Sequence, residues 1–215
     1  MNINDQQPVT EGLRFGTAGL RAPVGPGAQE MNVTQVTRTT AGVASWLAER
    51  AAARAASGAQ QHHLDPDTEA LLGEIHGNID DGALKVAVGF DARYGSHTFA
   101  VTAAEVFAGA GFEVTLLPTP TPTPVLAWLV KYRGLDAGVQ ITASHNPASD
   151  NGYKVYVDGG SQLISPDDRE IEKHIARISL DDVANIPRVT VRPAPDQLRH
   201  YLDAVVSLVE PASSD

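Results

Sequence analysis

The sequence at residues 140–157 reads Gln140-Ile-Thr-Ala-Ser-His-Asn-Pro-Ala-Ser-Asp-Asn-Gly-Tyr-Lys-Val-Tyr-Val157. It opens as an apolar strand, passes through a polar loop and closes as a second strand. Ser, Asn, Asp and Gly are common in turns, so the composition alone also fits an ordinary surface loop. Ser144 is distinctive because it lies just past the first strand and is followed directly by His145, Asn146 and a rigid proline. Lys154, on the second strand, is expected to lie close to the loop.

Strands and helices alternate along the rest of the chain. Strands are predicted at 13–15, 84–90, 112–117 and 137–142, in addition to the one at 153–157. Helices are predicted from Asn32 to about Ala56, from Ser96 to Ala110, at 125–132, from Ser165 to about Ile178 and from Asp196 onward, with Asn32, Ser96, Ser165 and Asp196 as N-caps. This order predicts an α/β fold, a three-layer α/β/α sandwich whose mostly parallel sheet is made mixed by its hairpin-like last strand.

The composition limits the classes of function. The chain has 215 residues, enough for one domain or for one domain and part of another, and its net charge is −10. An acidic chain has no general affinity for nucleic acid or anionic membranes, so an anionic ligand needs a local cluster of Arg and Lys. The absence of cysteine excludes disulfides, thiolate metal sites and cysteine nucleophiles. No segment has the pattern of a signal peptide or a bilayer-spanning helix, so we expect a cytoplasmic protein without membrane or nucleic-acid partners.

Two regions stand outside the main pattern. The polar segment 57–82 contains His62 and His63, but their spacing matches no metal-ligand motif, so we interpret this segment as a loop or insertion. The helix expected after Asp196 carries an apolar face at the end of the sequence. We therefore predict that residues 1–195 form one domain and that residues 196–215 begin a helix that leads into a second, truncated domain.

Ligands of α/β sheets bind beyond the carboxyl ends of the strands. Three loops are expected at that edge, at 16–21, 91–96 and 143–152. Together they are expected to gather a set of cationic and nucleophilic side chains: Arg21, Arg93, Ser144, His145 and, from the following strand, Lys154. A site of this composition suits an anionic ligand.

Two kinds of serine chemistry fit this edge. As a hydrolase nucleophile, Ser144 needs a nearby base, but the sequence has no Gly-x-Ser-x-Gly elbow and His145 is expected to point away from its neighbour's hydroxyl. As a phosphoserine, Ser144 needs Arg, Lys, backbone N–H groups or a divalent cation around it. Phosphoryl transfer relies mostly on positioning and charge neutralisation, so the cationic residues favour this second interpretation.

Four motifs carry a resemblance to a known family. They are Phe15-Gly-Thr-Ala-Gly-Leu-Arg21, Val88-Gly-Phe-Asp-Ala-Arg93, Pro118-Thr-Pro-Thr-Pro-Thr-Pro124, and Thr142-Ala-Ser-His-Asn-Pro147 with Asn151-Gly-Tyr-Lys154. In this order they resemble the motifs of the α-D-phosphohexomutases, which include phosphoglucomutase and phosphomannomutase, and the last resembles the family's active-site serine loop. The opening stretch Leu13–Arg21, with Gly25-Pro26-Gly27, looks most like the phosphoglucomutase/phosphopentomutase-like branch.

The resemblance implies a sugar-phosphate mutase that interconverts hexose 1-phosphate and 6-phosphate. Ser144 is then a phosphoserine, which donates its phosphoryl group to a sugar monophosphate. The bisphosphate intermediate returns its other phosphoryl group to Ser144. By the same resemblance, Arg21, His145 and Lys154 lie near the transferring group, where they assist proton transfer or balance charge.

Further roles and cofactors follow from the same resemblance. Thr17 and Asn146 are expected to shape the loop or bind phosphate. Arg93 is expected either to bind phosphate or to hold the loop backbone. The implied cofactors are Mg²⁺, which touches an oxygen of the phosphorylated Ser144, and an activator of the glucose 1,6-bisphosphate type.

The sequence also departs from the family pattern. The family holds Mg²⁺ in an Asp-Gly-Asp-Gly-Asp-type loop of its second domain, and no such loop is present here. The sugar-reading loop of the third domain and the phosphate-binding loop of the fourth are missing too. The implied partners are therefore a sugar phosphate and the remaining domains of the same enzyme, and we expect the fragment alone to be inactive.

Two alternatives to a mutase domain remain open. One is a sugar-phosphate- or nucleotide-binding α/β module without chemistry, and the other is a serine hydrolase. A dinucleotide-binding domain is disfavoured because no Gly-x-Gly-x-x-Gly follows the first strand. The sequence leaves open whether the sugar is a glucose, mannose, glucosamine or pentose phosphate.

Overall fold

A mixed sheet of six strands forms the centre of the protein. The structure, a computed structural model, describes residues 12–16, 19–57 and 82–208. The strands are β1 (Leu20–Pro23), β2 (Lys85–Phe90), β3 (Glu113–Leu116), β4 (Ala137–Ile141), β5 (Asp150–Val157) and β6 (Ser161–Gln162). They lie in the order β1-β5-β4-β2-β3, with β6 paired to β5. Strands β3, β2 and β4 are parallel, and β5 is antiparallel to both β4 and β1, so β1 shares the direction of the parallel strands.

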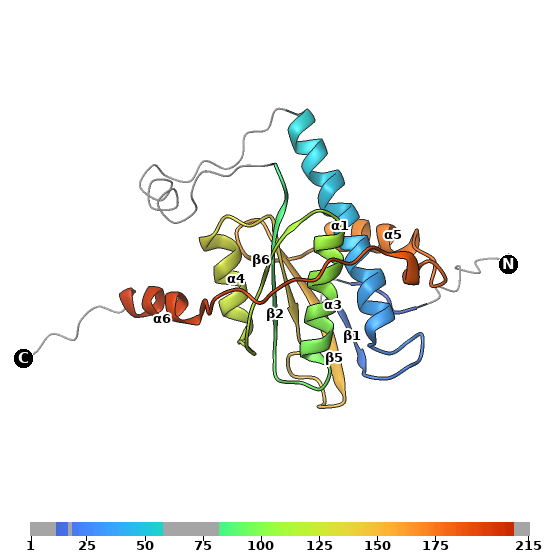
Figure 1. Cartoon of the computed structure of the whole chain (residues 1–215), viewed down its shortest axis with the longest axis horizontal. Helices are drawn as coiled ribbons and strands as arrows, with labels where there is room; N and C mark the ends of the chain where they lie inside the picture. The colour runs from blue at the N-terminus through green and yellow to red at the C-terminus, as the bar shows by residue number, and fades with distance from the viewer. Residues whose placement is uncertain (1–11, 17–18, 58–81, 209–215) are drawn as a thin grey trace, which may run out of the picture.

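Helices cover both faces of this sheet (Figure 1). α1 (Val33–Ala56), α3 (Ser96–Gly109) and α5 (Asp167–Ala176) lie on one face, and α4 (Thr123–Tyr132) lies on the other. The predicted three-layer sandwich is therefore confirmed. Asn32 caps α1 as predicted, because its side chain accepts a hydrogen bond from the Gln35 amide at 3.0 Å.

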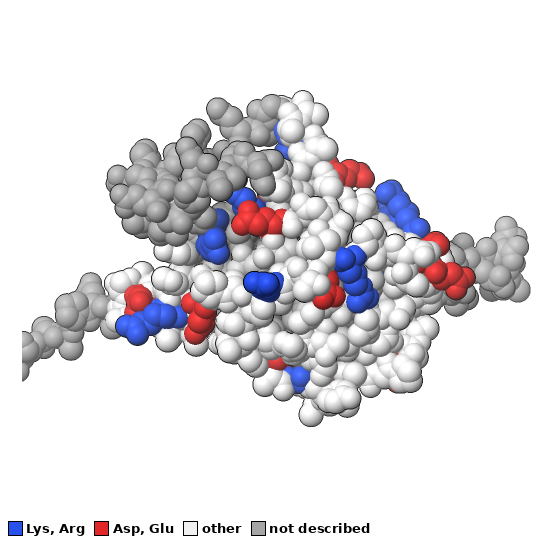
Figure 2. Space-filling view, viewed as in Figure 1, with Lys and Arg blue, Asp and Glu red and all other residues white. Residues whose placement is uncertain are grey.

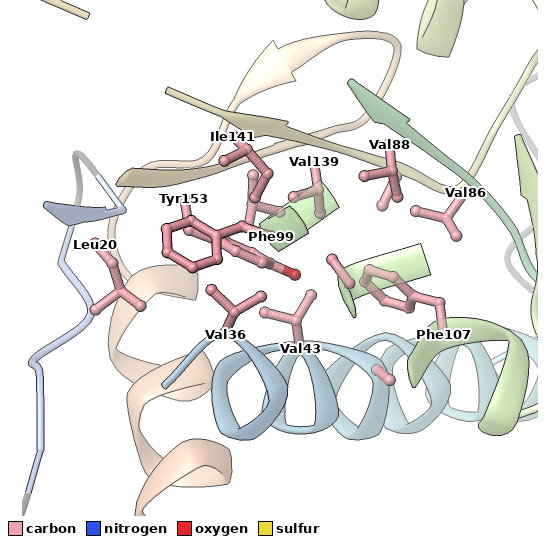
Figure 3. Packing of buried hydrophobic residues seen from close by; sticks show 14 of the residues in the cluster. Leu20, Val36, Val43, Val86, Val88, Phe99, Phe107, Val139, Ile141 and Tyr153 are labelled. Atoms are coloured by element: carbon pink, nitrogen blue, oxygen red, sulfur yellow. The ribbon is translucent and has the colours of Figure 1, made fainter. Parts of the chain in front are cut away.

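Successive side chains of β1 and β5 point to opposite faces of the sheet, so core residues and site residues alternate along these strands. Leu20 on β1 and Tyr153 on β5 point toward α1 and are fully buried (Figure 3). The hydroxyls of Tyr153 and Thr40 of α1 are 3.1 Å apart. Burial raises the pKa of Tyr153 well above its ordinary value, and the hydrogen bond with Thr40 only partly opposes this effect. Because successive side chains of a strand face opposite ways, Arg21 and Lys154 lie on the other face.

The prediction of a strand at 13–15 is wrong, since these residues lie outside the sheet. The side chain of Phe15 is buried in the core, and its amide donates a hydrogen bond to Oε2 of Glu172 in α5 at 2.7 Å. The backbone groups of Gly16 and Gly19 pair with each other just before β1. Arg21 therefore belongs to a strand rather than to a loop.

The loop predicted at 143–152 is shorter than expected. β5 begins at Asp150, because Asp150 and Asn151 pair with Pro23 and Ala22 of β1. These pairs extend β5 beyond the end of β4. The loop that carries Ser144 therefore spans residues 142–149, and it is called the serine loop below.

Two predicted N-caps occupy other positions. Ser96 is the first residue of α3, and its hydroxyl donates a hydrogen bond to Oδ1 of Asp91 at 2.6 Å. The hydroxyl of Ser165, which precedes the N-cap of α5, donates to Oδ1 of Asp168 at 2.8 Å. Each serine donates to a carboxylate, because a charged acceptor forms a stronger hydrogen bond than a neutral one.

α6 (Leu198–Ser207) projects from the body of the protein (Figure 1). Its N-cap is Gln197, one position after the predicted Asp196, whose carboxylate nevertheless accepts a hydrogen bond from the Leu198 amide at 2.9 Å. A connection that includes the short 3-10 helix η1 (Val183–Asn185) precedes it. No residue of α6 is buried. On the apolar face expected for this helix, Leu202 and Val205 are exposed, whereas Tyr201 is half-buried and its ring lies edge-on to that of Trp128 in α4, 5.7 Å away.

The surface shows no large field of one charge on the face drawn in Figure 2. There, Lys, Arg, Asp and Glu side chains are scattered among uncharged ones. Across the described ranges, no helix combines the length and the apolar character needed to cross a bilayer. His62 and His63 lie outside the described residues, so the interpretation of segment 57–82 stays a prediction.

Close packing of α1 on α5 yields a prediction about stability. A methyl group on Gly42 would come within 2.5 Å of Cγ1 and 2.9 Å of Cα of Ile175. Gly42→Ala is expected to lower the free energy of unfolding by about 1–2 kcal/mol, because the overpacking exceeds the gain in helix propensity. Urea unfolding measures the change, and Ala48→Ser on the exposed side of α1 should shift stability by less than about 0.5 kcal/mol. A Gly42→Ala chain as stable as the original would contradict the packing described here.

Candidate active site

One arginine holds the serine loop. The guanidinium of Arg93 donates hydrogen bonds to four backbone carbonyl oxygens. The acceptors are Ser144, Asn146, Pro147 and Asp150, at 2.7, 3.0, 2.8 and 3.1 Å. The Nε atom lies 3.2 Å from Oδ2 of Asp91, so all five N–H groups face protein acceptors. Of the two roles left open for Arg93, this geometry favours the one in which it holds the loop backbone.

Ser144 adopts a left-handed backbone conformation with φ of 57°. For a residue other than glycine this conformation costs about 1–3 kcal/mol and persists only where the surroundings hold it. The residue is exposed, and its Oγ accepts a hydrogen bond from Nζ of Lys154 at 2.7 Å. The hydroxyl and the amine therefore meet at the edge of the sheet where β4 ends.

Arg21 brings a second cation to this edge. It pairs with Gly152 across β1 and β5, two residues from Lys154 and on the same face of the sheet. Its Nη1 lies 3.4 Å from Oδ1 of Asn146, and its buried Nε has no hydrogen-bond partner among the described residues. Within the same ranges, neither Arg21 nor Lys154 forms an ion pair with a carboxylate. Two neighbouring cations without a counter-ion beside a hydroxyl favour an anionic ligand.

The surroundings of Lys154 also change its acidity. Burial lowers the pKa of Lys154 below its ordinary value, and the positive charge of Arg21 lowers it further. A lysine with a lowered pKa gives up its proton more easily, which suits an exchange of protons with the oxygen it contacts. Tyr156, on the same face of β5, has its pKa raised by burial, an effect that Arg21 opposes.

The remaining residues predicted for the site are Asn146, His145 and Thr17. Asn146 lies in the serine loop, with Oδ1 facing Arg21, and its Nδ2 donates a hydrogen bond to Oδ2 of Asp150 at 3.0 Å. His145 is exposed beside Ser144. Thr17 lies outside the described residues, so its role stays a prediction.

Asp91, Thr142 and Asn151 form a polar network under the loop, and no role for them followed from the sequence. Asp91 accepts hydrogen bonds from the hydroxyls of Ser96 and Thr142, both at 2.6 Å. Asn151 is buried and donates to the Tyr94 carbonyl and the Ser96 hydroxyl at 2.9 and 2.8 Å. The one sequence signal for this network was Asp91 itself, an aspartate at the end of a strand and two positions before Arg93.

The described residues do not form a metal site by themselves. Nowhere in these ranges do three or more His, Asp or Glu side chains gather in a way that would hold a metal ion. The carboxylate of Asp91 is already occupied by hydroxyls and by Arg93. Mg²⁺ prefers carboxylate and phosphate oxygens, so the contribution expected from this edge is an oxygen of a phosphorylated Ser144.

Comparison with known proteins identifies the family. The family profile described as "Phosphoglucomutase/phosphomannomutase, alpha/beta/alpha domain I" matches residues 53–182. The chain belongs to the α-D-phosphohexomutase family. The matched part of this family's domain I contains Ser144, Lys154 and Arg93, and Arg21 precedes it.

Individual mutases of this family match as well. The phosphopentomutase of Mus musculus is 38% identical over 169 residues, which cover 76% of this chain and 23% of that protein. A probable phosphomannomutase of Haemophilus influenzae is 45% identical over 106 residues, which cover 48% of this chain and 22% of that protein. The crystal structure of a putative phosphomannomutase from Thermus thermophilus superposes with a TM-score of 0.67 at 24% identity, covering 94% of this chain and 37% of that one, and it supports the fold. The matched segments thus cover less than a quarter of the length of these two curated relatives.

The role of Arg93 yields a prediction about local order. Lysine lacks the planar fork of arginine and cannot reach four carbonyl oxygens together. Arg93→Lys is therefore expected to speed amide hydrogen exchange at Asn146 and Asp150 by about tenfold or more, because the local opening of the loop becomes easier. Exchange measured by NMR tests this, with Arg199→Lys on exposed α6 as the matched control. Unchanged protection of the loop in Arg93→Lys would show that other contacts hold it.

Proposed function

We propose that the chain is the phosphoserine-bearing domain of a sugar-phosphate mutase that interconverts hexose 1-phosphate and 6-phosphate through a bisphosphate. The observation that carries this proposal is the 2.7 Å contact between Lys154 Nζ and Ser144 Oγ, on the same face of the sheet as Arg21. A serine that carries a phosphoryl group needs such cations, because the group brings nearly two negative charges. Membership of a family of mutases supports the same class of reaction.

In the proposed forward step, the phosphoryl group leaves Ser144 Oγ and bonds to a free hydroxyl oxygen of the sugar phosphate. The sugar hydroxyl loses a proton, and Ser144 Oγ gains one. Lys154 is suited to supply the proton to Oγ, because its ammonium donates to that atom and its lowered pKa makes it a stronger acid than an ordinary lysine. In the return step its neutral amine accepts the proton while the other phosphoryl group arrives.

Neighbouring residues complete the proposed reaction site. Arg21 stays charged and balances the phosphoryl oxygens. His145, exposed beside Ser144, assists proton transfer from the side of the sugar. Asn146 orients Arg21 through the contact with its Nη1, and Thr17 shapes the approach of phosphate.

The complete enzyme that we propose includes partners outside the described residues. Mg²⁺, when bound, neutralises charge on the phosphoryl group, and its main ligands are expected in a further domain. An activator of the glucose 1,6-bisphosphate type primes Ser144. We propose that residues 1–195 form the phosphoserine domain, that residues 196–215 lead toward the next one, and that the 215-residue chain alone shows no turnover. The proposed compartment is the cytoplasm.

Two other functions make different predictions about Ser144. A serine hydrolase has some support, since lysine acts as the base for the serine nucleophile in some hydrolases. A sugar-phosphate-binding module would use the same cations without chemistry. Labelling of Ser144 by a fluorophosphonate would favour the hydrolase, and binding of a sugar phosphate without phosphorylation of Ser144 would favour the module.

Replacement of the serine tests the proposed function. In the full-length protein, Ser144→Ala is expected to lower the rate of hexose-phosphate isomerisation by about a thousandfold or more, because the group that carries the phosphoryl is lost. Mass spectrometry should find one phosphoryl group on the parent protein and none on the variant. Ser149→Ala, an exposed serine of the same loop, is the matched control and should keep both properties. Full activity in the Ser144→Ala protein would refute the phosphoserine mechanism.

A further inference from the structure

Both backbone groups of Ser144 are held by other side chains. Its N–H donates a hydrogen bond to Oγ1 of Thr142 at 3.0 Å. Its carbonyl oxygen accepts one from Nη2 of Arg93 at 2.7 Å. Together these bonds fix the two peptide groups that flank the left-handed residue, so they set the direction of the Cα–Cβ bond that carries its hydroxyl.

Thr142 and Arg93 both contact the same carboxylate oxygen of Asp91. The Thr142 hydroxyl donates to Oδ2 of Asp91 at 2.6 Å, and Nε of Arg93 lies 3.2 Å from the same Oδ2. An ionised carboxylate only accepts hydrogen bonds, so the proton of the Thr142 hydroxyl must point toward Asp91. The lone pairs of that hydroxyl are then free for the Ser144 N–H. Asp91 thus sets the direction of the hydrogen bond that reaches the serine.

The other carboxylate oxygen of Asp91, Oδ1, binds groups at the start of α3. Oδ1 accepts hydrogen bonds from the Ser96 hydroxyl at 2.6 Å and from the Arg93 amide at 3.0 Å, and both groups belong to the turn that starts α3. One carboxylate therefore has a branch toward the helix through Oδ1 and a branch toward Ser144 through Oδ2. A role limited to the start of α3 would not require the second branch.

We propose that Asp91 is a positioning residue for Ser144, which acts through Thr142 and Arg93 to aim the serine hydroxyl at Lys154. This inference rests on the proposed function, because it concerns the phosphoryl transfer at Ser144. Displacement of a reacting group by about 1 Å is enough to slow a reaction about a hundredfold. Binding of the sugar phosphate depends on other groups, so the effect should appear in the transfer rate and not in KM.

Variants that cut one branch at a time test this role in the full-length protein. Thr142→Val keeps the shape of the side chain and removes only the relay, so it should slow single-turnover transfer from phosphorylated Ser144 to glucose 1-phosphate or mannose 1-phosphate by about ten- to a hundredfold. KM should stay within about twofold. Thr142→Ser, which restores a hydroxyl, should recover most of the rate.

The matched control cuts the other branch. Ser96→Ala also removes a buried hydroxyl from Asp91, but on the Oδ1 side. It removes an acceptor of Asn151 Nδ2 as well, but that group keeps its hydrogen bond to the Tyr94 carbonyl, so the transfer rate should stay within about twofold of the parent protein. Equal transfer rates in Thr142→Val and the parent protein, or equal losses in Thr142→Val and Ser96→Ala, would overturn the positioning role.

The same experiment separates the two proposals. If the parent protein carries phosphoserine and transfers it while Thr142→Val is unaffected, the positioning role fails and the proposed function stands. If the parent protein neither carries nor transfers a phosphoryl group at Ser144, the proposed function fails and the positioning role fails with it. A selective loss in Thr142→Val with recovery in Thr142→Ser supports both.

Discussion

The guanidinium of Arg93 organises the edge of the sheet that carries Ser144. Four of its N–H groups donate hydrogen bonds to carbonyl oxygens of the serine loop and the start of β5. Its fifth N–H faces Asp91 at the end of β2. A loop held at so many points tolerates a left-handed serine, because the cost of that conformation is offset by charge-assisted hydrogen bonds. Arg93 thus positions Ser144 through the backbone of the serine loop.

The sheet supplies the rest of the geometry. Arg21 and Lys154 are far apart in sequence, and they share a face because β1 pairs with the extended start of β5 in antiparallel register. The neighbouring residues on the same strands, Leu20 and Tyr153, face the other way and belong to the core cluster, where Tyr153 is hydrogen-bonded to Thr40 of α1. Core packing and site assembly therefore depend on the same register, and a slip by one residue would exchange the two faces.

Much of the fold was predictable from the sequence because its signals are local. The helical period after Asn32 and the apolar strands at 84–90 and 137–142 gave the correct element types and order. The strand proposed at 13–15 failed because Phe15 is buried outside the sheet and pairs its amide with Glu172, a contact 157 residues away. Ser96 failed as a cap because a carboxylate was within reach of its hydroxyl.

The site was predictable as a set of residue types but not as a set of contacts. The sequence motifs identified Ser144, Lys154, Arg21 and Arg93 as candidate site residues. In the structure, Ser144 and Lys154 are in contact. The link between Asp91 and Thr142 spans 51 residues and depends on the parallel pairing of β2 with β4, which no local pattern reveals. The role of Arg93 as a clamp for the loop likewise follows only from the distances to the carbonyl oxygens.

The proposed neutralisation of a phosphoryl group on Ser144 by Arg21 and Lys154 can be tested by titrating that group. Phosphoserine placed at position 144 during translation would be followed by ³¹P NMR as a function of pH, in the parent chain and in Lys154→Met. Free phosphoserine loses its second proton near about pH 6, and neighbouring cations favour the more highly charged form. We expect a phosphate pKa below the free value in the parent chain and a rise toward the free value in Lys154→Met. A phosphate that titrates like free phosphoserine in both chains would contradict it.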